Sequence, residues 1–178
     1  MLGLPCKVER DSEGKSGGVD VFWRRGVLVE LRNFSRFHID LEIREEDGFK
    51  WRFTVMYGEP RVEKKYLTWM LMKILHNQAS LPWLCARDFN EVLLAEEKEG
   101  GREKDQACME KFKEDLEFFG LEDLGFEGDK FTSWNNNHRW ENYIQEHLDR
   151  VVVNEVWRNR FEDFRVVNGD QRHSDHMP

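Results

Sequence analysis

Two short polar motifs, far apart in the sequence, carry the residues best suited to chemistry. Asp88-Phe89-Asn90 follows the apolar run 82–86, and Ser174-Asp175-His176 lies close to the last residue. A carboxylate and an amide that follow a buried strand can orient a water molecule and hold a phosphate oxygen. A carboxylate beside an imidazole can bind a metal ion or move a proton. Together the two motifs indicate a metal-assisted phosphodiesterase site.

Each motif also has a simpler structural interpretation. In extended chain, Asp88 and Asn90 would point to the same side, because side chains alternate along a strand. The same residue types are typical of a turn that ends a strand. His173 adds an imidazole to the second motif, but a zinc site from His173, Asp175 and His176 would lack convincing further ligands. On these residues alone, a turn and a surface loop are the simpler interpretations.

Two further residues could complete such a site. Asp149 lies inside the predicted strand 144–153, and a buried charge there needs a partner. The imidazole of His176, which Asp149 would orient, and the guanidinium of Arg150 are equally good candidates. Tyr57 ends a predicted strand and could offer its hydroxyl to a phosphate. More often, such a tyrosine simply has a buried ring and a solvated tip.

The polar segment 135–139 is predicted to be a hairpin that Trp134 and Trp140 flank. Every base has a face that can stack on an aromatic ring, so these tryptophans are the best placed to meet a base or a groove. We therefore predict DNA contacts from Trp134 and Arg139.

Hydrophobic periodicity predicts the elements that position these residues. In the first half, strands are expected at 19–23, 27–31, 39–43 and 51–57, and the third should have one wet face. Helices are expected around 67–75 and 109–119, the second ending at Gly120, with a strand buried on both faces at 82–86 between them and a loop at 98–105. Later strands are expected at 130–134, 144–153 and 164–167, with a brief helix capped by Asn154. This order indicates a layered α/β sandwich rather than an alternating parallel sheet.

Composition limits the class of protein. The 178 residues predict a single domain, 1–178, and 39% hydrophobic with 13% aromatic residues excludes a disordered chain. The net charge of -8 argues against tight nonspecific binding of nucleic acid, but not against an enzyme that grips a few phosphates through a metal. Three cysteines without CxxC spacing indicate free thiols. With no signal peptide and no apolar run that could span a membrane, we expect an intracellular protein of the nucleus or cytoplasm.

Five segments occur in a characteristic order: Tyr57-Gly58-Glu59-Pro60, 83–91, Phe131-Thr132, 145–150 and 174–178. This order resembles the endonuclease/exonuclease/phosphatase superfamily and, more narrowly, the endonuclease domain of plant LINE-type (non-LTR) retrotransposons. The resemblance extends from about Ser12 to Pro178. It implies an α/β (α+β) fold, the four-layer sandwich of the DNase I-like type, and hydrolysis of a phosphodiester that depends on Mg²⁺, with Mn²⁺ as an alternative.

The resemblance also implies roles for the site residues. Asp88 would orient or deprotonate the attacking water, Asn90 would hold that water or a phosphate oxygen, and Tyr57 would contact the phosphate. His176, aligned by Asp149, would bond a nonbridging oxygen, and Asp175 would help to bind the metal. DNA is the implied substrate of a monomeric domain, and a reverse transcriptase domain is expected in a full-length element.

This chain departs from the family at several positions. The family's first-strand Asn and its main metal-binding Glu have no counterpart here, Arg87 stands in place of a Gly, and His147 in place of the usual Arg. We therefore expect a Mg²⁺-dependent endonuclease domain that is incomplete at both ends and degenerate, with its activity weakened or lost. Two alternatives remain open: a hydrolase of the same fold that acts on small phosphate esters, and a non-catalytic binding module or fold remnant.

Overall fold

The structure is a computed structural model of the chain, and it describes residues 6–10, 19–23, 25–59, 61–78, 80–135, 137 and 139–168. The predicted motif Ser174-Asp175-His176 and the neighbouring His173 lie outside the described residues.

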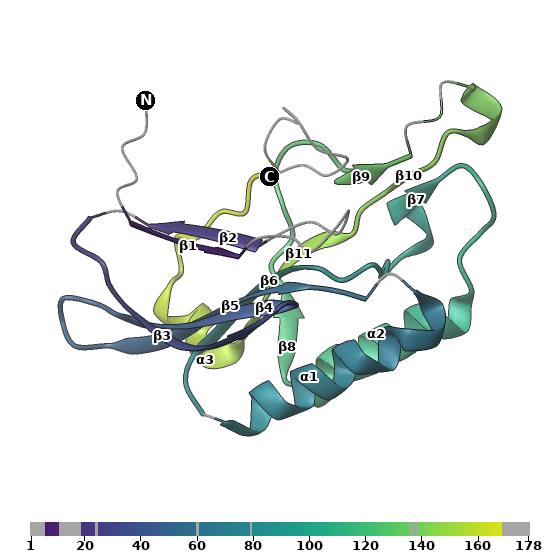
Figure 1. Cartoon of the computed structure of the whole chain (residues 1–178). Helices are drawn as coiled ribbons and strands as arrows, with labels where there is room; N and C mark the ends of the chain where they lie inside the picture. The colour runs from purple at the N-terminus through teal and green to yellow at the C-terminus, as the bar shows by residue number, and fades with distance from the viewer. Residues whose placement is uncertain are drawn as a thin grey trace.

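A six-stranded mixed sheet forms the centre of the molecule (Figure 1). Its strands β5 and β6 run parallel, and every other neighbouring pair is antiparallel. In spatial order the strands are β3 (Leu28–Ser35), β4 (His38–Arg44), β5 (Lys50–Tyr57), β6 (Trp83–Asp88), β11 (Asp149–Asn154) and β8 (Leu121–Asp123).

Two smaller sheets accompany the central one. An antiparallel pair combines β1 (Cys6–Arg10) with β2 (Val19–Trp23). A three-stranded sheet has the order β7 (Lys98–Glu99), β10 (Gln145–Glu146) and β9 (Ser133–Trp134). The helices are η1 (Val62–Lys64), α1 (Lys65–Gln78), η2 (Ala95–Glu97), α2 (Gln106–Phe118), η3 (Trp140–Asn142) and α3 (Glu155–Arg160).

Apolar residues bury both faces of the central sheet. Helices α1 and α2 lie along one face in Figure 1, and Met72 of α1 and Phe112 of α2 pack there with Met56 and Cys85 of the sheet. On the other face, Val21 of β2 packs against alternating residues of β4 (Ile39, Leu41 and Ile43). This arrangement of helices, sheet and strand pair agrees with the predicted layered sandwich.

The two long helices form where their periodicity predicts them. In α1 the buried positions Thr68, Met72 and Leu75 are three and four residues apart, which places them on one face. The side chain of Asp105 accepts a hydrogen bond from the Ala107 amide and caps α2. Gly120 follows α2 with a φ of 61°, the left-handed conformation that commonly ends a helix.

The expectation of a wet face on β4 is wrong because Asp40 is fully buried. The guanidinium of Arg52, also fully buried, donates to both Asp40 oxygens at 2.6 and 2.9 Å, and Thr54 Oγ1 donates to Oδ1 at 2.7 Å. Arg52 further donates to the carbonyl of Leu75 at 2.5 Å, near the end of α1. This ion pair therefore joins β4 and β5 to the helix that covers them.

The later strands are shorter than predicted. The segment 130–134 forms only β9. The segment 144–153 divides into β10 and β11, because the amides of His147 and Leu148 donate to Glu97 O and Thr132 Oγ1 and not to a neighbouring strand. The segment 164–167 forms an isolated bridge, Glu127 to Val167, rather than a strand. The expected loop 98–105 contains β7, and the Asn154 cap is confirmed by its bond from the Trp157 amide at 3.1 Å.

No helix within the described ranges has both the length and the apolar character needed to cross a membrane.

Replacing Arg52 with Ala should lower the free energy of unfolding by about 3–5 kcal/mol, because it removes both guanidinium hydrogen bonds from the buried Asp40 carboxylate and leaves only the more distant Arg32, at 3.5 Å, as its cation. Urea unfolding measures this loss. The exposed ion pair of Arg158 with Glu122 is the matched control, and Arg158→Ala should cost less than about 1 kcal/mol. Equal losses in the two variants would contradict the role given to the buried pair.

Candidate active site

Strand register brings three of the predicted site residues side by side. Asp88 at the end of β6 pairs with Tyr57 of β5 on one side and with Asp149 of β11 on the other. Side chains at paired positions share one face of a sheet. Because the alternate residues Met56 and Cys85 belong to the core under the helices, Tyr57, Asp88 and Asp149 lie on the opposite face. Their hydroxyl and carboxylates therefore lie together where β5 and β6 end and β11 begins, and this is the edge of the sheet that holds the candidate site.

Asn90 is held beside Asp88 by a turn, not by extended chain. Strand β6 ends at Asp88, and Asn90 has a φ of 54°, in the left-handed region that Asn tolerates better than most residues. Its amide N–H donates to Asp88 Oδ1 at 2.8 Å, and its side-chain nitrogen donates to Gly58 O at 3.1 Å. The turn, the simpler interpretation of these residues, is thus confirmed, and the extended alternative is wrong. The turn itself sets the Asn90 amide against the carboxylate.

Lys65, which the sequence analysis did not single out, holds the Asn90 turn through hydrogen bonds. Lys65, the first residue of α1, donates from Nζ to Asn90 O at 2.9 Å and to Glu91 Oε1 at 2.5 Å. The side chain of Glu91 is nearly buried, so the pair is shielded from water. Because the contacts join residues far apart in sequence, no local spacing could have revealed them.

Thr132 positions the backbone of Asp149. Its hydroxyl oxygen accepts the amide N–H groups of Leu148 and Asp149, both at 3.0 Å, and its side chain is 1% exposed. A hydroxyl oxygen has two acceptor sites, so this geometry uses both. Phe131-Thr132 belonged to the motif order noted above, but the sequence alone gave Thr132 no role.

The electrostatics around Tyr57 keep its hydroxyl protonated. Burial raises the pKa of Tyr57, and the carboxylates of Asp88, Glu59 and Asp149 raise it further. The tyrosine can therefore donate a hydrogen bond at any ordinary pH. Glu59 itself is held charged, because the hydrogen bonds from Arg61 lower the pKa of Glu59 to about 2 against the opposing effect of burial.

The donor chemistry at this edge suits a hard cation. Asp88, Asn90 and Asp149 offer oxygen atoms, which Mg²⁺ prefers, and Mg²⁺ is typically held by one or two carboxylates together with substrate phosphates and water. Within the ranges that the structure describes, no group of three or more His, Cys, Asp or Glu side chains is arranged to hold a metal ion. The predicted ligand Asp175 lies outside those ranges.

Arg150 and His147 face away from this site. The Arg150 guanidinium donates to Asp123 Oδ2 at 2.7 Å and also to Glu97. His147 is 2% exposed, and its ring stacks on Phe126 with centroids 4.3 Å apart. Burial lowers the pKa of His147, and the neighbouring Arg150 lowers it further. The alternative pairing of Asp149 with His176 stays a prediction, because His176 lies outside the described residues.

The predicted hairpin forms, and its base adjoins Asp149 through Thr132, the residue before β9. Strands β9 and β10 pair, and Asn135 secures the tip through bonds to Ile144 N at 2.9 Å and Asn142 O at 2.7 Å. In Figure 1 this hairpin projects beyond the central sheet. Trp134 is half-buried and Arg139 is exposed, so a DNA contact by these two residues stays a prediction.

The backbone at Arg87, which replaces the family's Gly, pairs regularly with Met56 and Arg150. Its side chain lies outside what the structure describes.

Solved structures with the same architecture exist. The endonuclease domain of TRAS1, a telomere-specific non-LTR retrotransposon, superposes with a TM-score of 0.71 and 16% identity, over 97% of this chain and 76% of that domain. An endonuclease/exonuclease/phosphatase family protein from Leptotrichia buccalis gives a TM-score of 0.55 and 17% identity, over 97% of this chain and 69% of that protein. No protein-family model and no curated protein matches the sequence.

These likenesses show the fold. The chain has the mixed α/β architecture of the DNase I-like endonuclease/exonuclease/phosphatase proteins, and the resemblance inferred from the motif order is confirmed at that level.

Thr132→Val should lower the free energy of unfolding by about 1–3 kcal/mol, because it leaves two amide N–H groups without an acceptor while keeping the side-chain volume. Thr132→Ser retains the oxygen and should lose less. Urea unfolding of both variants tests the assignment, and a valine variant as stable as the serine variant would refute it.

Stability should also fall on mild acidification. The lowered pKa of His147 means that the folded chain binds a proton less readily than the unfolded chain. The free energy of unfolding should therefore decrease as the pH falls below about 6.5, the pKa of a histidine in the unfolded chain. His147→Gln removes the His147 share of this proton uptake and should make the dependence between pH 7 and 5 less steep, while His38, whose pKa burial also lowers, keeps its own share. Parallel stability curves for the two proteins would show that His147 does not contribute.

Proposed function

We propose that this chain is a nuclease-type domain that hydrolyses DNA phosphodiesters with the help of Mg²⁺, like the endonucleases of non-LTR retrotransposons. The observation that carries the proposal is the register that sets Tyr57 and Asp149 on either side of Asp88. The shared fold with the TRAS1 endonuclease domain supports it.

Each residue at this edge has a chemical part in the proposed reaction. The Asp88 carboxylate accepts a hydrogen bond from the attacking water and orients it toward phosphorus. The Asn90 side chain has a second N–H beyond the one bound to Gly58, and it donates to the water or to a phosphate oxygen. The protonated Tyr57 hydroxyl donates to a phosphate oxygen. These donors stabilise the charge that develops as the water attacks.

The remaining roles fall on residues at the C-terminus. We place His176 on a nonbridging phosphate oxygen, with its ring orientation set by Asp149. Thr132 acts on this pair indirectly, because it fixes the Asp149 backbone. Asp175 would join the carboxylates of Asp88 or Asp149 in holding Mg²⁺.

The charge of the site supports the need for a cation. Asp88, Glu59 and Asp149 all lie close enough to Tyr57 to raise its pKa. A phosphate approaching these carboxylates is repelled unless a positive charge intervenes. Bound Mg²⁺ would supply that charge and act as a Lewis acid toward the phosphoryl oxygen, and Mn²⁺ has compatible ligand chemistry.

Two observations favour a second function, that of a non-catalytic binding module. The residues described by the structure contain no cluster of three metal-ligating side chains, and the chain has a net charge of -8. A module of this kind would keep the fold and the phosphate-facing edge without turnover. It would bind DNA or another partner independently of a divalent cation.

The wider setting follows from the same proposal. We place the chain as a single monomeric domain, 1–178, that works on DNA in the nucleus or cytoplasm. A reverse transcriptase domain would accompany it in a full-length element.

Nicking of supercoiled plasmid in Mg²⁺ tests the proposal. Asp88→Asn should lower the nicking rate by at least about 100-fold, the usual worth of a positioned general base. Tyr57→Phe should lower it less, by about 10-fold, because one hydrogen bond to the phosphate is lost. Asp47→Asn, in an exposed turn, is the control and should nick as the parent does.

The two functions give opposite outcomes. Nicking that persists at the parental rate in Asp88→Asn excludes this site. Plasmid binding without nicking, unchanged by removal of Mg²⁺, would establish the binding module instead.

A further inference from the structure

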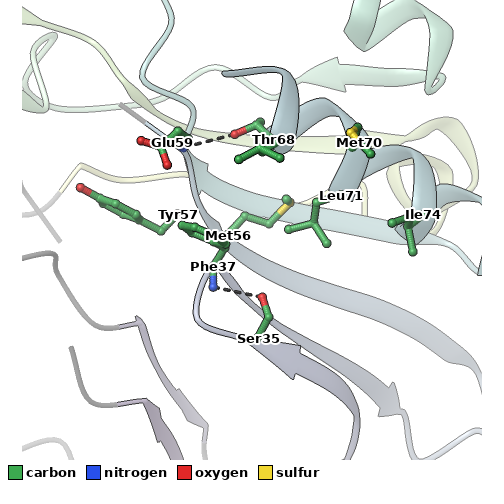
Figure 2. A pocket seen from close by; sticks show the side chains of 10 residues that line it. Ser35, Phe37, Met56, Tyr57, Glu59, Thr68, Met70, Leu71 and Ile74 are labelled. Carbon is green, nitrogen blue, oxygen red and sulfur yellow. Dashed lines mark hydrogen bonds between the residues drawn. The ribbon is translucent and has the colours of Figure 1, made fainter. Parts of the chain in front are cut away.

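A cavity of about 260 Å³ shares one lining residue, Tyr57, with the proposed phosphate site. It lies between the tip of the β3–β4 hairpin, the end of β5 and helix α1 (Figure 2). The walls come from Phe37, Met56, Leu67 and Leu71, and they are almost wholly apolar. Two more α1 residues line the cavity, Met70 and Ile74, each with 53% of its surface exposed. The molecule thus keeps apolar surface open to solvent at this point.

Apart from Tyr57, the polar side chains that line the cavity are engaged within the protein. Ser35 Oγ lies 2.7 Å from His38 Nδ1 and accepts the Phe37 amide at 3.1 Å. The hydroxyl of Thr68 accepts the Glu59 amide at 3.2 Å, as Figure 2 shows. An occupant is therefore held by shape and apolar contact more than by new hydrogen bonds to these groups.

Tyr57 connects the cavity to the phosphate site. It lines the cavity, and Figure 2 shows its hydroxyl pointing away from Met56 and Leu71. That hydroxyl lies within the field of Asp88 and Asp149, whose carboxylates raise its pKa. A molecule with a phosphate at Tyr57 would therefore have a neighbouring group within reach of the cavity.

Cationic side chains stand near the cavity. The Arg36 guanidinium lies 4.4 Å from the centroid of the Phe37 ring, and Arg36 is exposed. Arg61, whose side chain is 52% exposed, binds the Glu59 carboxylate at the cavity wall. Guanidinium groups bind phosphate and stack on planar rings. This combination favours a strand of nucleic acid over an uncharged apolar partner.

We infer that the cavity receives one unpaired nucleobase of a DNA strand whose backbone phosphate lies at Tyr57. The inference rests on the proposed function and adds a base subsite to it. The volume falls just below the range of about 300–1,000 Å³ for sites that enclose drug-sized ligands, so it suits a single ring system. The Phe37 ring and the Met56 and Met70 thioethers are favourable neighbours for an aromatic base. Since the lining polar groups are paired internally, recognition should tolerate any base.

Binding of single-stranded oligothymidylate tests this inference. The chain is titrated, in Ca²⁺, with a series of eight-nucleotide strands that each have one abasic position. A gel confirms that the strands stay intact. Loss of the base at one position should weaken binding by about 5- to 150-fold, the range that stacking of one base supplies. An abasic substitution at a position remote from this critical base should weaken binding much less.

Ile74→Trp is designed to fill the cavity from its exposed rim. It should bind the intact strand as weakly as the parent binds the critical abasic strand, and it should lose the position dependence. Val156→Trp makes the same change at an exposed site on α3, where Val156 is 59% exposed, and should bind as the parent does. Circular dichroism checks that both variants are folded.

The outcomes separate this inference from the proposed function. Binding is measured without requiring hydrolysis, so a chain that fails to nick plasmid can still show the base subsite. Equal affinity for every abasic strand, no DNA binding, or an Ile74→Trp variant that binds like its parent would each overturn the inference. Equal affinity for every abasic strand, together with active nicking, would leave the proposed function standing. It would point to an apolar side chain of a protein partner as the occupant of the cavity.

Discussion

The register of three neighbouring strands determines where Tyr57, Asp88 and Asp149 of the candidate site lie. The parallel pairing of β5 with β6 sets Tyr57 against Asp88, and the antiparallel pairing of β6 with β11 sets Asp149 on the other side. A shift of one residue in either pairing would turn a site residue toward the helix-covered core. The buried apolar faces on both sides of the sheet oppose such a shift, so the core holds the chemistry in place.

Buried polar contacts then fix the ends of these strands. The Arg52–Asp40 pair ties α1 to the sheet, Lys65 at the start of the same helix holds the Asn90 turn, and Thr132 holds the first residue of β11. Each contact satisfies groups that would be costly to bury alone. The same helix and strand end also line the apolar cavity, so the phosphate site and the inferred base subsite share one rigid support.

Local hydrophobic periodicity predicted the helices and strands well, but it did not predict the contacts between them. The helices at 65–78 and 106–118 and the strand at 83–88 follow from apolar spacing, and the Gly120 and Asn154 signals mark real helix boundaries. The wet face expected on β4 failed because the partner of Asp40, Arg52, lies on another strand. Strand 144–153 was predicted as continuous because hydropathy does not reveal that Thr132 and Glu97 take its amides. Lys65 was missed for the same reason, whereas Tyr57, Asp88 and Asp149 were found because each sits where a strand begins or ends.

The most direct measurement is amide chemical-shift mapping of the isotopically labelled chain with a short DNA duplex in Mg²⁺. If DNA phosphates bind where β5, β6 and β11 meet, the largest shifts should occur at Gly58, Phe89, Asn90 and Asp149, the amides that border the paired side chains. Shifts confined to the exposed edge strand β3 or to α2, with these four amides unmoved, would contradict a phosphate site at this edge of the sheet.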